Sequence, residues 1–275
     1  MTADDRPAGH SANGTDQANP VVDLRDPVID LRDRTLRELT PVSTMSGRPA
    51  ALQDHHRLVT IDTDDLLERA ERFVYEHYLR IGFCEPSPRE RVEELAPWAD
   101  RAHMHAVIDD DEMIVGTIRT IFGNYGELPV AQFERTDHEM PDPVCELSSL
   151  VVRQRDRGTG VIEHLYRAGW LNAFRLKASA IVGLIDPWLF DAFVDHYGLP
   201  FRVIGTPSHY MGTDPVPVGM PLVGPAYDDL ARRNPAFWLW TLEALSPAEI
   251  GAWGLPLILH DDVAAAMARA ERDRG

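Results

Sequence analysis

A segment near the middle of the chain has the residue types needed to bind a phosphate group. Residues 145–152 form an apolar, β-branched run, and an amphipathic stretch begins at Val161. Between them stand three arginines and a glycine turn: Arg153, Arg155, Arg157, Gly158, Thr159 and Gly160. A strand that leads through a glycine turn into a helix presents free backbone N–H groups, and the helix dipole adds positive charge there. The guanidinium groups would strengthen the binding of an anion.

The two glycines alone do not decide between a phosphate site and an ordinary tight turn, in which glycine supplies a positive φ. A dinucleotide-binding turn is disfavoured, because Gly-x-Gly-x-x-Gly would need glycine at position 163, where the chain has Glu163. A P-loop is excluded, since no Gly-Lys-Ser/Thr follows. The arginine three residues before the first glycine favours the phosphate site.

The hydrophobic pattern predicts the elements that position this turn. Expected strands cover residues 58–61, 103–108, 113–121, 145–152, 179–185 and 201–205. Expected helices cover residues 64–81, 89–95, 161–176, 187–197, 227–245 and 261–272. Residues 215–225 are rich in proline and glycine and are interpreted as a connection. This order predicts one α/β domain with a mixed, largely antiparallel sheet flanked by helices.

The two ends of the chain differ in composition from its middle. Residues 1–47 are polar, with few aromatic residues, and are expected to form a disordered tail. Residues 48–220 would form the catalytic domain, and residues 221–275 a helical C-terminal extension. We expect this extension to cover a ligand tunnel or to form the face of a homodimer.

The spacing Arg155-x-x-Gly158-x-Gly160, together with the element order over residues 58–215, resembles the GNAT acyltransferases. Within them the chain is most similar to the branch that contains the acyl-homoserine-lactone synthases and the N-acyl amino acid synthases. That branch carries Gly-x-x-Arg in an early strand, here ending in Arg119, and Glu-x-Ser-Arg before the turn, here 146–149. It also has an acidic segment, here near Asp100. Ser149 replaces the usual arginine, which argues against homoserine lactone synthesis.

The resemblance implies that an acyl group moves from a pantetheine thioester to the amine of an amino-acid-like molecule. The donor would be acyl-CoA or an acyl carrier protein, bound by residues 150–153, 155 and 157–161. These are Leu150, Val151, Val152, Arg153, Arg155, Arg157, Gly158, Thr159, Gly160 and Val161. Arg119, Asp100 and Ser148 would contact the amine substrate. An ordinary GNAT acetyltransferase and an inactive thioester- or lipid-sensing module remain alternatives.

Aminolysis of a thioester needs a base, because the amine is mostly protonated at neutral pH. Glu146 is the best candidate, since burial in an apolar strand would raise its pKa. A structural carboxylate paired with Arg119 is nearly as good an interpretation. Tyr166 and Tyr197 are candidate acids for the leaving thiolate, although each is more often a packing aromatic.

The composition of the chain limits the classes of partner that it could bind. The net charge of −17 argues against nucleic acid. Residues 150–180 nevertheless hold six basic and two acidic residues. This basic region, Arg153 to Lys177, is a candidate contact for an acyl carrier protein. No run is long and apolar enough for a membrane span, no secretion signal is visible, and two cysteines fit a reducing cytoplasm. The histidines lack metal-ligand spacing, so no metal is expected.

Overall fold

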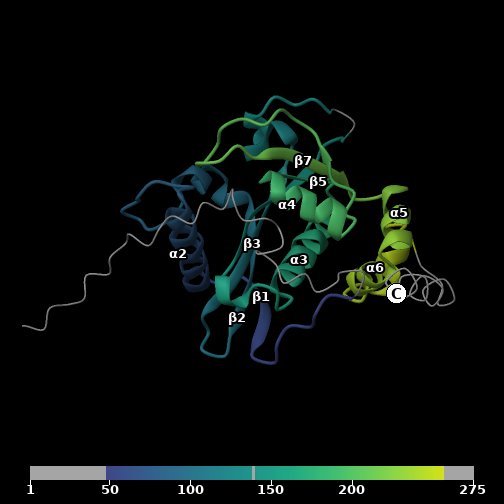
Figure 1. Cartoon of the computed structure of the whole chain (residues 1–275), viewed down its shortest axis with the longest axis horizontal. Helices are drawn as coiled ribbons and strands as arrows, with labels where there is room; N and C mark the ends of the chain where they lie inside the picture. Colours follow the sequence, from purple (N-terminus) through teal and green to yellow (C-terminus); the bar gives the residue numbers. More distant parts are fainter. Residues whose placement is uncertain (1–47, 138–139, 257–275) are drawn as a thin grey trace, which may run out of the picture. The chain divides into compact units, whose positions relative to one another are not determined.

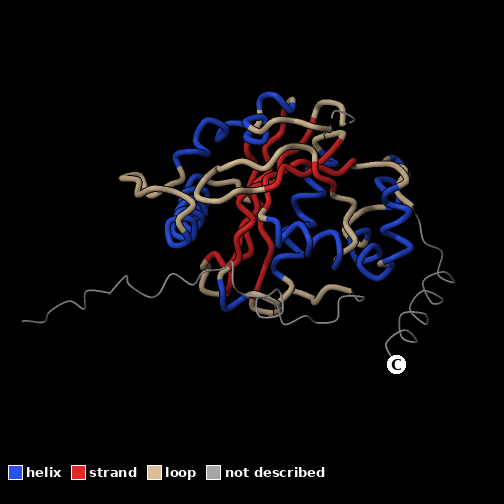
Figure 2. The backbone as a smooth tube through the Cα atoms, turned by 45° about the horizontal axis from the view of Figure 1, so that its top comes forward, coloured by secondary structure: helices blue, strands red, loops and turns tan. Residues whose placement is uncertain are grey.

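The computed structural model describes residues 48–137 and 140–256. The expected tail at residues 1–47 and the expected helix at 261–272 lie outside the described residues. Figure 2 shows the strands running through the middle of the described chain, with helices on both sides.

A seven-stranded sheet with the order β1-β2-β3-β4-β5-β7-β6 forms the centre of the fold. Its strands are β1 (His56–Thr60), β2 (Ala102–Asp109), β3 (Ile114–Gly123), β4 (Val144–Val152), β5 (Ala180–Ile185), β6 (Arg202–Val203) and β7 (Val216–Pro221). Among these strands β4 and β5 pair parallel, and every other neighbouring pair is antiparallel. The mixed, largely antiparallel sheet expected from the sequence is confirmed.

The α-helices of the described residues are α2 (Asp64–Ile81), α3 (Val161–Arg175), α4 (Pro187–Asp191), α5 (Ala226–Arg233), α6 (Pro235–Leu242) and α7 (Pro247–Ala252). The 3₁₀ segments are η1 (Glu93–Arg101), η2 (Tyr125–Glu127), η3 (Pro129–Gln132) and η4 (Gln154–Asp156), and η5 (Ala192–His196) is π-helical. The segment expected to be helical at residues 89–95 therefore forms a helix only from Glu93. The expected helix at 187–197 is α4 continued by the π-helical η5.

Helices α2 and α3 lie on opposite sides of β3 (Figure 1). Helix α2 begins where the Thr63 side chain accepts the N–H of Leu66, and it ends at Gly82 with φ +77°. Helix α3 approaches the sheet closely at Gly169, where an added Cβ would lie 2.8 Å from Ile118 and 3.1 Å from Leu147. From Gly116 onward, even-numbered residues of β3 therefore face α3 and odd-numbered residues face the α2 side. Before the bulge in the β2–β3 ladder the pattern is reversed: Ile114 packs with α2 and Val115 with α3.

The proline-rich segment at residues 215–225, expected to be a connection, contains strand β7. This expectation is wrong because the prolines of β7 do not interrupt its ladder with β5. The Pro217 carbonyl accepts a hydrogen bond from the Ile204 N–H, so the Pro217 nitrogen also faces β6. Pro221, four residues on, has the same orientation. The N–H groups that β5 requires belong to the intervening residues.

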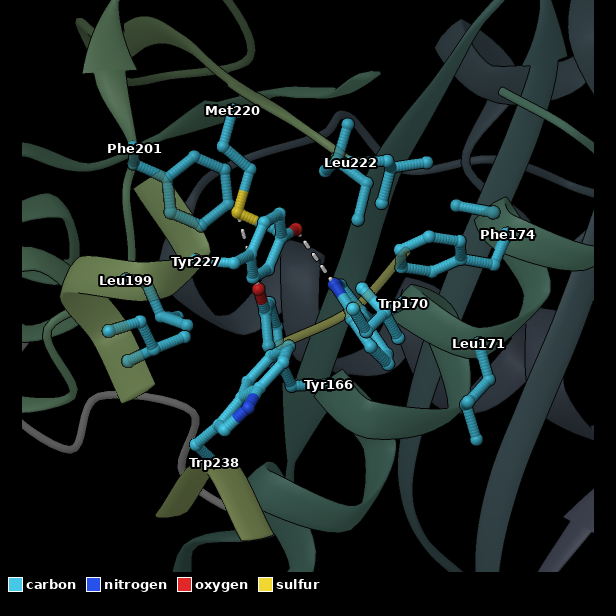
Figure 3. Close-up of a cluster of buried hydrophobic side chains, with 14 of the residues drawn as sticks. Tyr166, Trp170, Leu171, Phe174, Leu199, Phe201, Met220, Leu222, Tyr227 and Trp238 are labelled. Atoms are coloured by element: carbon cyan, nitrogen blue, oxygen red, sulfur yellow. Dashed lines mark hydrogen bonds between the residues drawn. The ribbon is translucent and has the colours of Figure 1, made fainter. Parts of the chain in front are cut away.

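The expected helix at 227–245 is two helices, separated at Asn234 and Pro235. The Asn234 side chain accepts the N–H of Phe237 at 3.3 Å and starts α6, while Pro235 occupies its first position. Both helices pack on α3: Trp238 and Tyr227 of the C-terminal helices contact Trp170 of α3 (Figure 3). The C-terminal helices and the sheet therefore share one hydrophobic core.

Candidate active site

Strands β4 and β5 separate in the middle of the sheet. Their pairing covers only Val144 to Leu147 of β4, opposite Ala180 to Gly183 of β5. The pairing of β4 with β3 shifts by one residue between the Arg119 and Thr117 partners, which marks a β-bulge. Within the bulge Ser149 has φ +48°, and its carbonyl accepts the Thr117 hydroxyl at 3.1 Å. Residues 148–152 of β4 consequently have no β5 partner in the ladder.

Three side chains singled out in the sequence share one face beside this split. Arg119 of β3 is the cross-strand partner of Ser148, and Ile121 is the partner of Glu146. Because residues two apart on a strand lie on the same face, Arg119, Glu146 and Ser148 all face the α2 side. The Ser148 hydroxyl is buried and has no hydrogen-bond partner among the described residues. The alternation of β3 and β4 thus gathers a cation, a carboxylate and a hydroxyl.

Glu146 carries a buried carboxyl group. The residue is 1% exposed, and one carboxylate oxygen accepts the backbone N–H of Val130 at 2.9 Å. Burial raises the pKa of Glu146 to about 8, and the Val130 hydrogen bond offsets only part of this effect. A carboxyl group with this pKa can both take and return a proton near neutral pH.

Arg119 is not the partner of Glu146, so the pairing considered from the sequence is wrong. Its guanidinium group contacts Glu71 of α2 at 3.5 Å and the Met104 sulfur at 3.6 Å. Arg119 is 4% exposed, and its Nε has no hydrogen-bond partner among the described residues. The two groups share a face without neutralising each other, because α2 supplies the acid that faces Arg119.

Two tyrosines that sequence reasoning missed lie near Glu146. Tyr125 follows β3, and Tyr210 comes from the connection between β6 and β7. Both hydroxyl oxygens are buried without a normal hydrogen bond. Burial and the Glu146 charge raise the pKa of each. No local motif marked them, because both reach the site from connections.

Tyr166 and Tyr197 lie on the α3 side of the sheet, away from Glu146. The Tyr166 hydroxyl donates to the Met220 sulfur at 3.6 Å within the apolar cluster (Figure 3). The Tyr197 hydroxyl donates to Glu163 at 3.1 Å. Both rings line a small pocket with Glu163 and Phe237. The structure thus separates these two phenols from the candidate base by the thickness of the sheet.

Asp100 is exposed in η1. No contact of Asp100 with Arg119 or Glu146 is present in the described part of the chain. Asp100 is therefore not brought to Arg119 or Glu146, and Glu71 is the acid that faces Arg119.

The glycine turn after β4 has the expected local geometry. Gly158 and Gly160 have φ of +79° and +82°, and Gly160 is the N-cap of α3. The first intrahelical bond runs from the His164 N–H to the Gly160 carbonyl, which leaves the N–H groups of the first turn without helix partners. The Thr159 hydroxyl donates to the Asp156 carbonyl at 2.6 Å and braces the turn. Val161, 1% exposed, anchors α3 in the core.

The three arginines before this turn have different environments. Arg153 pairs with Asp156, and its guanidinium also contacts Asp109 at 3.2 Å. Arg155 is 72% exposed and has a long contact of 3.8 Å with Asp156. Arg157 has no acidic partner among the described residues. Arg153 therefore fixes the loop, whereas Arg155 and Arg157 are the arginines whose charge is available to a ligand.

The wider basic region is also largely engaged within the chain. Arg167 donates to the Trp240 carbonyl at 2.8 Å and lies 3.9 Å from the centre of the Trp240 ring. Arg175 approaches Glu249 at 3.8 Å. These contacts hold the C-terminal helices against α3, which leaves fewer free charges for a carrier protein than the sequence suggests.

The segment that precedes β1 lies over the first turn of α3. The Ala50 carbonyl would be 2.5 Å from a Cβ added to Gly160, and His164 Nε2 lies 3.3 Å from the same oxygen. Leu52 packs against the cluster that includes Val161. Glycine at position 160 is therefore required both by its positive φ and by this close approach.

Replacing Gly160 with alanine should destabilise the fold by about 1–2 kcal/mol, because the turn must distort. It should also weaken the coenzyme A binding that the sequence leads us to expect at this turn. Denaturant unfolding and calorimetric titration would measure the two effects. Gly126→Ala is the control, since an added Cβ there meets nothing within 4 Å. Coenzyme A affinity that is equal in Gly160→Ala and wild type would contradict the assigned role of the turn.

Comparisons with known proteins support the fold. No family model and no curated protein matches the chain. Among solved structures, the acyl-homoserine-lactone synthase LasI matches with a TM-score of 0.53 and 12% identity, covering 66% of this chain and 95% of LasI. The CoA-dependent synthase BjaI matches with a TM-score of 0.50 and 14% identity, covering 78% of this chain and 99% of BjaI. The chain has a GNAT-like fold.

The described residues hold neither a candidate membrane span nor a candidate metal cluster. None of the helices there has both the length and the hydropathy needed to cross a bilayer. No cluster of three or more histidine, cysteine, aspartate or glutamate side chains suited to a metal ion occurs in the same part of the chain.

Proposed function

We propose that this protein is an N-acyltransferase that moves an acyl group from a thioester to the amine of an amino-acid-like molecule. The observation that carries the proposal is the position of Glu146. It is a buried carboxyl group with a pKa near 8, located beside the unpaired half of β4 in a GNAT-like sheet.

The donor would bind along the split between β4 and β5. Its pantetheine arm would use the free backbone groups of residues 148–152, and its phosphates would lie at the glycine turn with Arg155 and Arg157. Coenzyme A dependence is stated for BjaI, and we extend it to this chain as part of the proposal. An acyl carrier protein is the alternative donor.

The acceptor would bind on the polar face. Arg119 suits a carboxylate of the acceptor, and the unpartnered Ser148 hydroxyl supplies a further hydrogen bond. Glu146 would remove one proton from the acceptor ammonium group. The neutral nitrogen would then attack the thioester carbon, and the sulfur would leave as a thiolate when the C–S bond breaks. The nitrogen would lose its second proton to solvent as the amide forms.

Thiol release tests the proposal directly. Purified protein would be incubated with acetyl-, octanoyl- and palmitoyl-CoA, or the matching acyl carrier proteins, and with pooled amino acids. We expect amine-dependent release of thiol together with a product of amide mass. Release from acetyl-CoA only would favour an ordinary acetyltransferase. Bound thioester without release would favour a sensing module, and absence of binding would refute the donor site.

Replacing Arg119 with lysine should raise the KM for the acceptor by about 10–100-fold, with little change in the KM for the thioester. Lysine keeps the charge but loses the planar fork that binds a carboxylate through two hydrogen bonds. Steady-state kinetics with each substrate varied in turn would measure the KM for the acceptor and the KM for the thioester separately. Arg101→Lys, at an exposed ion pair with Glu127, is the matched control. A rise confined to the thioester KM would be inconsistent with acceptor binding at Arg119.

A further inference from the structure

A buried histidine, His56, lies against the loop that leads from β4 to the glycine turn. It is the first residue of β1, and its side chain is fully buried. Its Nε2 atom lies 3.6 Å from a carboxylate oxygen of Asp156, which is longer than a hydrogen bond. Neither ring nitrogen has a hydrogen-bond partner among the described residues. Buried polar groups are normally paired, so an imidazole with two unpaired nitrogens is unusual in a folded protein.

The imidazole adjoins a cluster of charged side chains from several elements. Asp156 of η4 turns one carboxylate oxygen to His56 and the other to Arg153. Arg153 also contacts Asp109, at the end of β2, at 3.2 Å. Arg155 is 3.8 Å from Asp156 but 72% exposed, so solvent screens its charge. The buried cluster therefore holds two carboxylates and one guanidinium, and a protonated imidazole would make it neutral.

Asp156 connects this cluster to the proposed phosphate site. Its carbonyl accepts the Thr159 hydroxyl at 2.6 Å, and Thr159 stands between the two glycines of positive φ. Phosphates bound at that turn would therefore lie close to buried groups with an excess of negative charge. Like charges repel more strongly where water is excluded, so the donor would bind better if the cluster were neutral. His56 can supply the missing charge, because histidine gains a proton near neutral pH.

We propose that His56 is a positioning residue that takes up a proton from solvent when the donor phosphates bind at the glycine turn. The inference rests on the proposed function and extends it to the regulation of the same site. The proton would turn the 3.6 Å contact with Asp156 into a charge-assisted pair and hold that carboxylate inside the fold. Because protonation and donor binding are linked, each favours the other by the same factor.

The surroundings of His56 determine the direction of the pH dependence. Burial lowers its pKa below the ordinary value, and the charges of His55 and Arg153 lower it further. The Asp156 and Asp109 carboxylates raise the pKa of His56 without outweighing burial. The imidazole of the free protein is therefore neutral at neutral pH, and added phosphate charge would raise its pKa. Donor affinity should consequently increase as pH falls below neutrality, since the complex gains the proton before the free protein does.

Calorimetric titration with dephospho-CoA tests this proposal. The probe keeps the pyrophosphate but lacks the 3′-phosphate, so none of its phosphate groups titrates near neutral pH. Titrations at about pH 6 in buffers of different ionisation enthalpy count the protons taken up on binding. We expect an uptake of roughly 0.3–1 proton, and a Kd about tenfold lower at about pH 5.5 than at about pH 8. His56→Gln should abolish both effects and still bind the probe.

Two other histidines near the turn sharpen the comparison. His55→Gln is the matched control, because His55 is exposed and its ring lies 4.3 Å from that of His56. This variant should retain the proton uptake. His164, in the first turn of α3, is the competing site. Uptake that is lost in His164→Gln but kept in His56→Gln would overturn the proposal.

The wild-type protein provides a readout that does not depend on the folding of a variant. The ring protons of His56, assigned from their contacts with His55, can be followed by NMR during a pH titration. Dephospho-CoA should raise the pKa of His56, and an unchanged pKa in the complex would overturn the proposal. Binding without proton uptake would refute this inference alone, whereas no binding at any pH would refute the proposed donor site as well.

Discussion

Replacing Glu146 with glutamine should lower kcat for amide formation by about 10²–10⁴-fold, which is the usual contribution of a positioned general base. In the wild type, the carboxyl must be deprotonated to accept a proton. Because its pKa is about 8, activity should rise tenfold per pH unit below pH 8 and level off above it. The ascending limb should be absent from the residual activity of Glu146→Gln. Initial rates measured from about pH 6 to about pH 10 would record both profiles.

Glu127→Gln is the control for this substitution, since Glu127 forms an exposed ion pair with Arg101. The stability of Glu146→Gln separates lost chemistry from lost folding. Folding raises the Glu146 pKa above its ordinary 4.5, so the stability contributed by the protonated group is present below pH 4.5 and is lost as pH rises through about 8. Above this pH the wild type must bury a charged carboxylate. Glutamine has no charge at any pH, so Glu146→Gln should be more stable than wild type at pH 9. Full activity, or a variant less stable at that pH, would contradict the assignment.

Replacing Trp238 with alanine should reduce the free energy of unfolding by about 3–5 kcal/mol, as expected for a large side chain removed from a packed core. Trp238 is fully buried, its ring lies 5.3 Å from that of Tyr227, and its Nε1 donates to the Pro256 carbonyl at 2.9 Å. The substitution leaves both a cavity and an unsatisfied carbonyl. Chemical denaturation with far-UV circular dichroism would measure the loss.

The matched control is Trp188→Ala in α4, where the side chain is 42% exposed. We expect a change within about 0.5 kcal/mol there. If both tryptophan variants lost the same small amount, the C-terminal helices would not be part of the core. In that case, removing residues after about 225 should leave the rest of the protein folded, whereas the shared core predicts that it will not.

The sequence predicted those elements whose signals are local. Helix α2 begins and ends where expected, because Thr63 supplies a cap and Gly82 supplies the left-handed residue at its end. Strand β7 could not be recognised, because proline is compatible with a strand only when its nitrogen faces away from the pairing partner. That orientation depends on which strand lies on each side, and a single segment does not contain this information.

In the candidate site, too, the sequence predicted what strand geometry determines and missed what depends on tertiary packing. Arg119, Glu146 and Ser148 share a face because strand alternation and antiparallel register determine it. The partner of Arg119 was missed because Glu71 is supplied by α2, whose rotation over the sheet is a tertiary property. Tyr210 was missed for a related reason: its turn is recognisable only once Met211 and Gly212 are seen at positive φ.

A proline of β7 also influences how this protein behaves at high concentration. Strand β6 pairs with Val218 and Gly219, and the Ile204 N–H bonds the Pro217 carbonyl, so among the described residues the outer side of β7 lacks a strand partner only beyond Gly219. Pro221 faces that side and carries no N–H, so an incoming strand would find no donor there. Edge-to-edge association of the sheet, a common route to aggregation, is therefore disfavoured at this margin. Substituting Pro221 should make the protein more prone to it.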